Sequence, residues 1–227
     1  MTKLGVFVGL FILVIVLWVY YLQFYKVSTD YKIFADDLIN HQFLKTGDMI
    51  LFKAYNNFNS IFHGSYYGHV GIVYILAGTP MLFEANGIER VSLREHHSKR
   101  GVYLTPLVDR IKKYKGRCFW KPLNRSLDEH AIQDFDNFVQ YCLGNLEYDY
   151  AVVSGGFKRW LGLAKCGKGT DCGQVAFLSL IKLGLLPVEE YDTPRLHHLK
   201  YVCNLEALIN GYKYIPLVEV IDHPFAD

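Results

Sequence analysis

The sequence has almost no excess of charge of either sign. Its 227 residues include 24 Lys and Arg against 22 Asp and Glu, which gives a formal net charge of +2. Proteins that bind nucleic acids attract the phosphates through a clear excess of basic residues, and this balance supplies none. The one dense basic segment, residues 110–117, is typical of a solvated face. The composition therefore argues against a nucleic-acid partner.

The sequence also lacks the close cysteine pairs of a zinc site. No two cysteines lie two to four residues apart, and the histidine pairs at 96–97 and 197–198 have no further ligands at a metal-binding spacing. The five cysteines are Cys118, Cys142, Cys166, Cys172 and Cys203. Because their number is odd, at least one thiol stays outside any disulfide within the chain. We predict neither a metal nor an organic cofactor.

Linkers rich in proline or serine, low-complexity tracts and internal repeats are absent as well. Hydrophobic residues make up 51% of the chain and aromatic residues 15%, which is enough to bury a sizeable core and excludes disorder as the main state. We therefore expect one folded domain over residues 29–227, preceded by a separate N-terminal segment over residues 1–28.

The N-terminal segment contains a long uncharged run at residues 4–22. At about 1.5 Å per residue, a helix of this run spans roughly 28 Å, close to the hydrocarbon thickness of a bilayer. A cleaved secretion signal is the alternative, but the run ends in bulky Tyr20, Tyr21 and Leu22 rather than at a small-residue cleavage site. The sequence thus predicts one transmembrane helix, with the lipid bilayer as a partner. The expected location is a membrane, either a viral envelope or an inner membrane, and the orientation stays open.

The first half of the domain has the pattern of strands. Residues 49–53 follow a turn signal at 46–48, and residues 70–76 and 81–85 flank the turn-forming segment 77–80, which predicts an antiparallel hairpin. Weaker strand patterns follow at residues 88–93 and 117–121, and a final strand is expected within 212–221.

The second half has the pattern of helices. Ser126 and Glu129 resemble a capping box ahead of an amphipathic stretch that reaches Cys142. Residues 175–183 are apolar almost all round, which predicts a buried helix, with Thr170 or Asp171 as its N-cap. Strands followed by helices are typical of an α+β fold.

Cys172 is the first candidate for chemistry, because it lies in the first turn of this buried helix. Backbone N–H groups and the helix dipole at that position favour a thiolate, although the neighbouring carboxylate of Asp171 opposes it. Unpaired amides there could also stabilise an oxyanion. A small apolar residue that packs well at a helix start is the plainer interpretation.

His69 is the second candidate, and the predicted hairpin supplies a third. A loop over residues 75–80 pairs Gly71 with Glu84 and His69 with Asn86, so that Glu84 and Asn86 share the face of His69. A tight turn at residues 78–79 instead places Glu84 opposite Val73, out of reach of His69. An acid beside the imidazole would orient it as a base toward a thiol. Whether Glu84 or Asn86 is the third member stays open.

These motifs resemble, in their order, the permuted papain-fold cysteine hydrolases of the NlpC superfamily, in the YiiX/YaeF-like branch. The similar segments are residues 47–52, 69–73, 83–85, 148–149 and 170–172 with the apolar helix that follows. In this branch the His precedes the Cys, as His69 precedes Cys172 here. One departure is Gly173-Gln174, where relatives commonly have Ser-Glu.

The resemblance implies a circularly permuted, papain-like antiparallel sheet packed against helices. It implies Cys172 as nucleophile, His69 as base and Glu84 as the polar third residue. The expected function is that of a membrane-anchored cysteine hydrolase, which cleaves a peptide-type or acyl amide bond through a thioester. Its substrate is then a peptide or a lipid amide. The alternatives are a lipid acyltransferase or thioesterase of the same superfamily, and a non-enzymatic structural component of a membrane.

Overall fold

The computed structural model describes residues 3–24, 29–40, 42–54, 65–86, 101–145, 170–188 and 198–221. The described strands form one seven-stranded sheet. In spatial order they are β1 (Lys32–Phe34), β7 (Val218–Ile221), β6 (Gly116–Lys121), β2 (Met49–Ala54), β3 (His69–Leu76), β4 (Thr79–Asn86) and β5 (Gly101–Pro106). β1 pairs with β7 in parallel, and the other neighbours are antiparallel.

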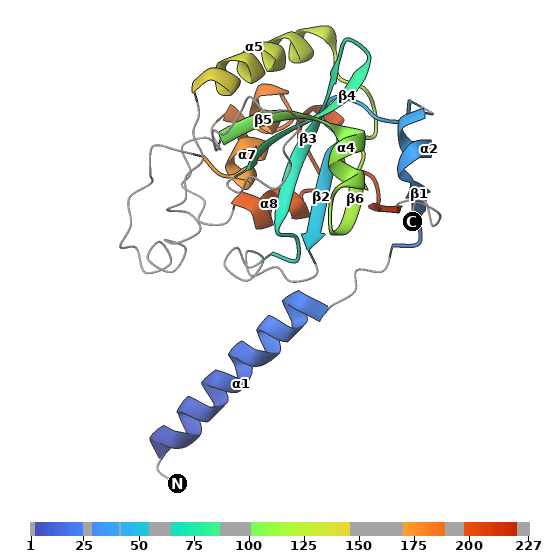
Figure 1. Ribbon diagram of the computed structural model, residues 1–227. Coiled ribbons are helices and arrows are strands. Elements are labelled where there is room, and N and C mark those ends of the chain that lie inside the picture. The colour runs from blue at the N-terminus through green and yellow to red at the C-terminus, as the bar shows by residue number, and fades with distance from the viewer. Residues whose placement is uncertain are drawn as a thin grey trace.

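Helices cover both faces of this sheet (Figure 1). One hydrophobic core lies between the sheet and the helices α5, α7 and α8, and a second lies between the sheet and the helices α2 and α4. The described helices are α1 (Lys3–Phe24), α2 (Ala35–Asn40), α4 (Leu107–Lys112), α5 (Glu129–Asn145), α7 (Cys172–Lys182) and α8 (His198–Asn204), with a 3-10 turn, η2 (Ile209–Gly211). The fold is therefore a mixed α+β architecture in which the two faces of the sheet have separate cores.

Most expected strands are present, and the helix ends differ in detail. The predicted strands at 49–53, 70–76, 81–85 and 117–121 correspond to β2, β3, β4 and β6, while the final strand covers only Val218–Ile221. The expected strand at 88–93 and the motif at 148–149 lie outside the described residues. The capping box at Ser126 is wrong, because Asp128 Oδ1 accepts the first-turn N–H of Ala131 at 2.8 Å. The short elements β1, β5, α2, α4 and α8 were not expected from the sequence.

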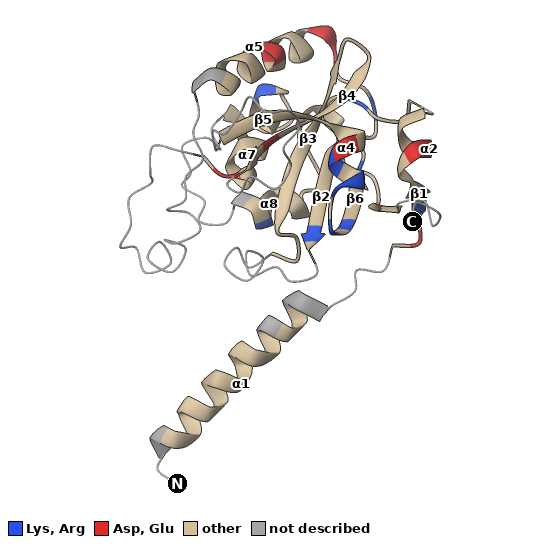
Figure 2. Cartoon of the chain, in the orientation of Figure 1, with Lys and Arg blue, Asp and Glu red and all other residues tan. Residues whose placement is uncertain are grey.

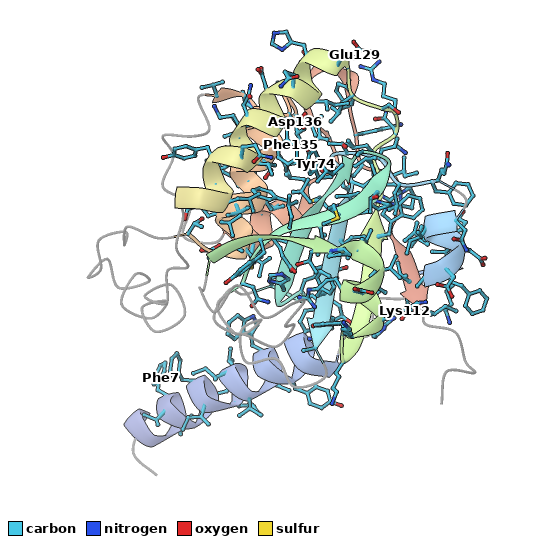
Figure 3. All side chains as sticks on the ribbon, turned by 45° about the horizontal axis from the view of Figure 1, so that its top comes forward. Phe7, Tyr74, Lys112, Glu129, Phe135 and Asp136 are labelled. Atoms are coloured by element: carbon cyan, nitrogen blue, oxygen red, sulfur yellow. The ribbon has the colours of Figure 1, made fainter. Side chains whose placement is uncertain are left out.

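The predicted transmembrane anchor is the main error in the expected fold. In the described part of the chain, no helix combines the length and the apolar character needed to cross a membrane. Figure 1 shows α1 apart from the sheet, and Figure 3 shows its labelled Phe7 directed outward.

The core on the α5 and α7 side is built around aromatic contacts. Phe135 of α5 packs edge-on against Tyr74 of β3 and Phe83 of β4, with ring centroids 5.7 Å apart in each pair. Figure 3 shows the labelled Phe135 and Tyr74 side by side beneath α5. Edge-to-face aromatic pairs add specific geometry to the burial of large apolar surfaces. These contacts hold α5 over the β3–β4 hairpin.

The β3–β4 hairpin is closed by a two-residue turn at Ala77 and Gly78. Both residues have positive φ, 47° and 79°, as a type I′ turn requires. The turn is tight, as in one of the two expected arrangements, but it lies one residue earlier than expected. The resulting register pairs Leu76 with Thr79 and Ile72 with Phe83. Continued by one residue, the same register sets Glu84 opposite Gly71, which is the arrangement expected from the longer loop.

The buried carboxylate of Asp48, directly before β2, forms hydrogen bonds to groups before β2 and at the end of β6. Its Oδ2 accepts the indole N–H of Trp120 at 2.9 Å and the backbone N–H of Lys45 at 3.0 Å, and its Oδ1 accepts the backbone N–H of Leu123 at 2.8 Å. Burial raises the pKa of Asp48 from 3.8 to about 6, and these donors only partly offset the effect. Asp48 is therefore a structural carboxylate in the turn before β2.

We predict that Asp48 makes the fold more stable as the pH falls from about 7.5 to about 5. A carboxyl group whose pKa is raised by folding contributes stability at low pH and loses it as the pH rises through the folded-state pKa; the difference here is about 1 kcal/mol over this window. Urea unfolding of the native chain and of Asp48→Asn at both pH values measures it. An equal pH dependence in both proteins would contradict the prediction.

Candidate functional site

His69 begins β3 and is held at its Nε2 by Glu84. The ring packs against Phe52 of the neighbouring strand β2, with centroids 5.5 Å apart. Nε2 lies 2.5 Å from Oε2 of Glu84. When Nε2 carries the proton of a neutral imidazole and donates it to a carboxylate, Nδ1 is left as an acceptor. Among the described residues, no hydrogen bond to Nδ1 is present.

Glu84 lies on β4, where the hairpin register brings it to the His69 side of the sheet. Its side chain is 2% exposed and has two partners, because Oε1 accepts a hydrogen bond of 2.8 Å from Nε of Arg110. Burial alone would raise the pKa of Glu84, but the hydrogen bond and charge of His69, followed by those of Arg110, outweigh it and hold the pKa at about 2. Glu84 is therefore an ionised carboxylate in a buried site.

The alternative third residue, Asn86, lies two residues farther along β4. It is paired with Gly101 of β5 at the end of the ladder. The contact with His69 is made by Glu84. Of the two residues that the sequence left open, the structure therefore brings Glu84 to the imidazole.

Arg110 of α4 was missed by the sequence reasoning, which took residues 110–117 for a solvated face. The residue is 4% exposed, and its guanidinium lies over the rings of Phe52 at 4.4 Å and Tyr114 at 5.3 Å. A signal was present, since Arg110 follows Leu107 by three residues and precedes Ile111, so all three share one face of a helix. Figure 2 shows α4 carrying basic and acidic residues together, unlike a uniformly basic face.

Cys172 begins α7, as expected, and Asp171 is the N-cap. Asp171 Oδ1 accepts the backbone N–H of Gln174 at 2.8 Å, so this amide is not available to an oxyanion. The Cys172 side chain is 4% exposed. Burial raises the pKa of the Cys172 thiol well above its usual range, and the charge of Asp171 adds to this, whereas hydrogen bonds from the backbone of Val70 and Gly173 lower it. The resting thiol is therefore neutral.

The Cys172 sulfur lies near the backbone N–H of Val70, at the start of β3, since this N–H lowers the pKa of the thiol. In an antiparallel strand, the N–H groups of successive residues point to alternate sides. The N–H of Val73 points toward β2, because it donates to the backbone oxygen of Asp48 at 2.8 Å. The N–H of Val70, three residues earlier, therefore points toward β4. Pairing between β3 and β4 ends at Ile72 and Phe83. The N–H of Val70 is thus left outside the β3–β4 ladder, and it lowers the pKa of the nearby Cys172 thiol.

The Cys172 thiol and the His69 imidazole lie on opposite faces of the sheet. Cys172 belongs with Val70 to the core beneath α7, whereas the contacts of His69 and Glu84 are with Phe52 and α4 on the other face. His69 immediately precedes Val70, whose N–H contacts the sulfur. Within the described residues, no hydrogen bond joins Cys172 to His69. The structure therefore brings His69 and Glu84 into contact, and it places Cys172 on the other face of the sheet, near Val70, with its thiol in the neutral form.

Gly173 explains the local departure from the Ser-Glu pattern. A Cβ at position 173 would collide with the backbone of Leu199 in α8. A side chain here would push α8 away from α7. The glycine therefore belongs to the packing of these two helices at the start of α7.

A metal site is not formed by the described residues: no group of three or more His, Cys, Asp or Glu side chains among them could hold a metal ion. The four described cysteines, Cys118, Cys142, Cys172 and Cys203, are buried thiols. Cys166 and the histidine pair at 96–97 lie outside the described residues.

Comparison with known proteins gives a distant structural likeness. No family model matches the chain, and no curated protein matches it. Among solved structures the chain is similar to metalloprotein YiiX from Escherichia coli O157:H7, with 20% sequence identity and a TM-score of 0.43. The match covers 61% of this chain and 65% of that one, so the chain spans less than two thirds of YiiX. The likeness is to YiiX and does not extend to membership of the NlpC superfamily.

We predict that Glu84 stabilises the fold at neutral pH and loses this effect in acid. A carboxyl group whose pKa is lowered by folding, here from 4.5 to about 2, contributes stability above the unfolded-state pKa that disappears as the pH falls through the folded-state value. The difference in unfolding free energy between the native chain and Glu84→Gln should therefore be largest near neutral pH, at about 3 kcal/mol, and shrink between about pH 4.5 and about pH 2.

The matched control is Glu129→Gln, which makes the same chemical change at the exposed start of α5. Urea unfolding of all three proteins across this pH range is the measurement. A Glu84→Gln difference that stays constant with pH would show that the carboxylate is not ionised in the fold.

Proposed function

We propose that the chain is a papain-like cysteine hydrolase that cleaves an amide bond of a peptide or a lipid amide through Cys172, His69 and Glu84. The observation that carries the proposal is the order of contacts at the edge of β3. Glu84 contacts Nε2 of His69, and the backbone N–H of the next residue, Val70, lies near enough to the Cys172 sulfur to lower the pKa of the thiol. A nucleophile, a base and an orienting acid in this order are the parts of a nucleophilic site.

The steps follow from the positions of the two ring nitrogens. Nδ1 of His69, which accepts no hydrogen bond from the described residues, takes the thiol proton as the sulfur attacks the carbonyl carbon. The C–N bond then breaks, the imidazolium gives its proton to the leaving amine, and a thioester remains on Cys172. Water, deprotonated by the same nitrogen, attacks the thioester and releases a carboxylic acid and the free thiol.

The neutral resting thiol determines how this site would be activated. Because the thiol pKa is raised by burial, a thiolate–imidazolium pair is not formed in advance. The proton instead moves to His69 as the bond to the substrate forms, in the manner of a serine nucleophile. Glu84 stabilises the imidazolium that results, since its carboxylate stays ionised at neutral pH.

We predict that Cys172→Ala abolishes hydrolysis with little change in folding. A peptide library and a lipid-amide panel, followed by mass spectrometry, would detect the products and distinguish the two substrate classes. His69→Ala should lower the rate by about a hundred- to ten-thousand-fold, as expected for loss of a general base, and Glu84→Gln should lower it less. Transfer of the acyl group to an alcohol in place of water would identify an acyltransferase.

The control is Cys142→Ala, which removes another fully buried thiol from α5. It should lower stability by about 1–3 kcal/mol and leave the rate per folded molecule unchanged. Full activity of Cys172→Ala on a substrate that the native chain hydrolyses would overturn the assignment of the nucleophile.

We also predict that iodoacetamide alkylates Cys172 slowly near neutral pH and faster as the pH rises, because only the thiolate reacts. Peptide mapping after timed alkylation of the folded chain measures the rate at each cysteine. Fast alkylation that is independent of pH above the acidic range would show a preformed thiolate and contradict the neutral resting state.

A further inference from the structure

Arg110 is a buried charged side chain that contacts the candidate site and has no part in the steps above. We propose that Arg110 is a positioning residue, which holds Glu84 so that one carboxylate oxygen faces His69 and which supplies the permanent countercharge of this buried carboxylate. This inference rests on the proposed function of His69 and Glu84.

Each oxygen of the Glu84 carboxylate has its own partner. Oε1 accepts the Nε–H of Arg110 at 2.8 Å, and Oε2 faces Nε2 of His69. A carboxylate with one partner can rotate about its last side-chain bond, whereas one bonded at both oxygens by groups on different elements cannot do so without losing a contact. Arg110 therefore fixes which oxygen is presented to the imidazole.

Arg110 can do this because it is itself held on three sides. Its guanidinium lies against Phe52 and Tyr114, and its Nε points at Glu84. α4 begins at Leu107, directly after β5, and β5 is paired with β4 so that Tyr103 lies opposite Glu84. The chain thus turns back from β5 and sets Arg110 over the strand that carries Glu84. A planar guanidinium between rings keeps its orientation better than a flexible ammonium would.

Arg110 also supplies the positive charge beside the Glu84 carboxylate. Glu84 is buried and ionised, and Arg110 is the cation beside it. A buried carboxylate must be neutralised by a partner or by a proton. Without Arg110, the remaining partner in contact with Glu84 is His69, and a protonated imidazole cannot accept the proton of a thiol. Arg110 therefore supplies a countercharge to the buried acid that does not depend on a proton at His69.

The chain contains a matched pair that separates this role from an ordinary structural ion pair. Arg117 of β6 donates its Nε–H to Oε1 of Glu219 at 2.6 Å and lies over the ring of Phe119 at 4.8 Å. The same donor atom, acceptor atom and ring contact thus occur in a pair that involves neither His69 nor Glu84. Arg117→Met is the control for the loss of one Arg–Glu pair of this kind.

The test compares Arg110→Met, Arg110→Lys and Arg117→Met in the full chain. The first measurement is the low-field proton resonance of the His69 Nε2–H bond to Glu84, recorded by NMR, which needs no activity. We expect it to be lost or strongly shifted in Arg110→Met and unchanged in Arg117→Met.

The second measurement is the pH–rate profile with p-nitrophenyl acetate as acyl donor. Its acidic limb should move to higher pH in Arg110→Met, with kcat reduced more than KM is changed, and Arg110→Lys should restore part of both.

These outcomes separate the two hypotheses. An unchanged resonance in Arg110→Met overturns the positioning role whether or not the chain is an enzyme, and so does an equal shift of the acidic limb in Arg110→Met and Arg117→Met. A native chain that forms no acyl-enzyme with p-nitrophenyl acetate, but whose resonance responds as expected, overturns the proposed function and leaves the positioning of Glu84 supported. If Arg110→Met does not fold, Arg110→Lys carries the test, because it keeps the charge but loses the Nε donor and the planar group over Phe52.

Discussion

The buried carboxylate of Glu84 is the constraint on which the candidate site depends. An ionised carboxylate cannot be removed from water unless it is paired and hydrogen-bonded, and Glu84 has a partner at each oxygen. One partner, His69, comes from the neighbouring strand, and the other, Arg110, comes from a short helix more than twenty residues later in the chain. Satisfying this one group therefore fixes β3, β4 and α4 relative to one another and sets the orientation of the imidazole.

The end of the β3–β4 ladder is the second feature of this region. The paired residues end at Ile72 and Phe83, so the N–H of Val70 lies outside the ladder, and it lowers the pKa of the nearby Cys172 thiol on the α7 face. A continuous ladder would have closed this edge. The type I′ turn at Ala77 and Gly78 sets the register that makes the arrangement work, since a shift of one residue would move Glu84 to the opposite face.

Local patterns predicted the parts of the fold that depend on neighbours in sequence. Alternating β-branched residues around a turn indicated the β3–β4 hairpin, and an all-apolar stretch after Asp171 indicated α7, because periodicity and capping act within one element. The same kind of pattern failed at residues 4–22, for which a membrane-spanning helix was expected and none is found among the described residues. It also failed at Arg110, where a run of basic residues concealed one that points into the core.

The sequence by itself determined which residues could carry chemistry: a cysteine at a helix start, a histidine at a strand start, and an acid on the next strand. It left open whether Glu84 or Asn86 meets His69, because both lie on the same face of β4. Only the tertiary structure decided that Glu84 does, that Arg110 occupies its second oxygen, and that the thiol is neutral at rest. Each of these depends on burial and on contacts between elements distant in the chain, and neither residue type nor periodicity encodes them.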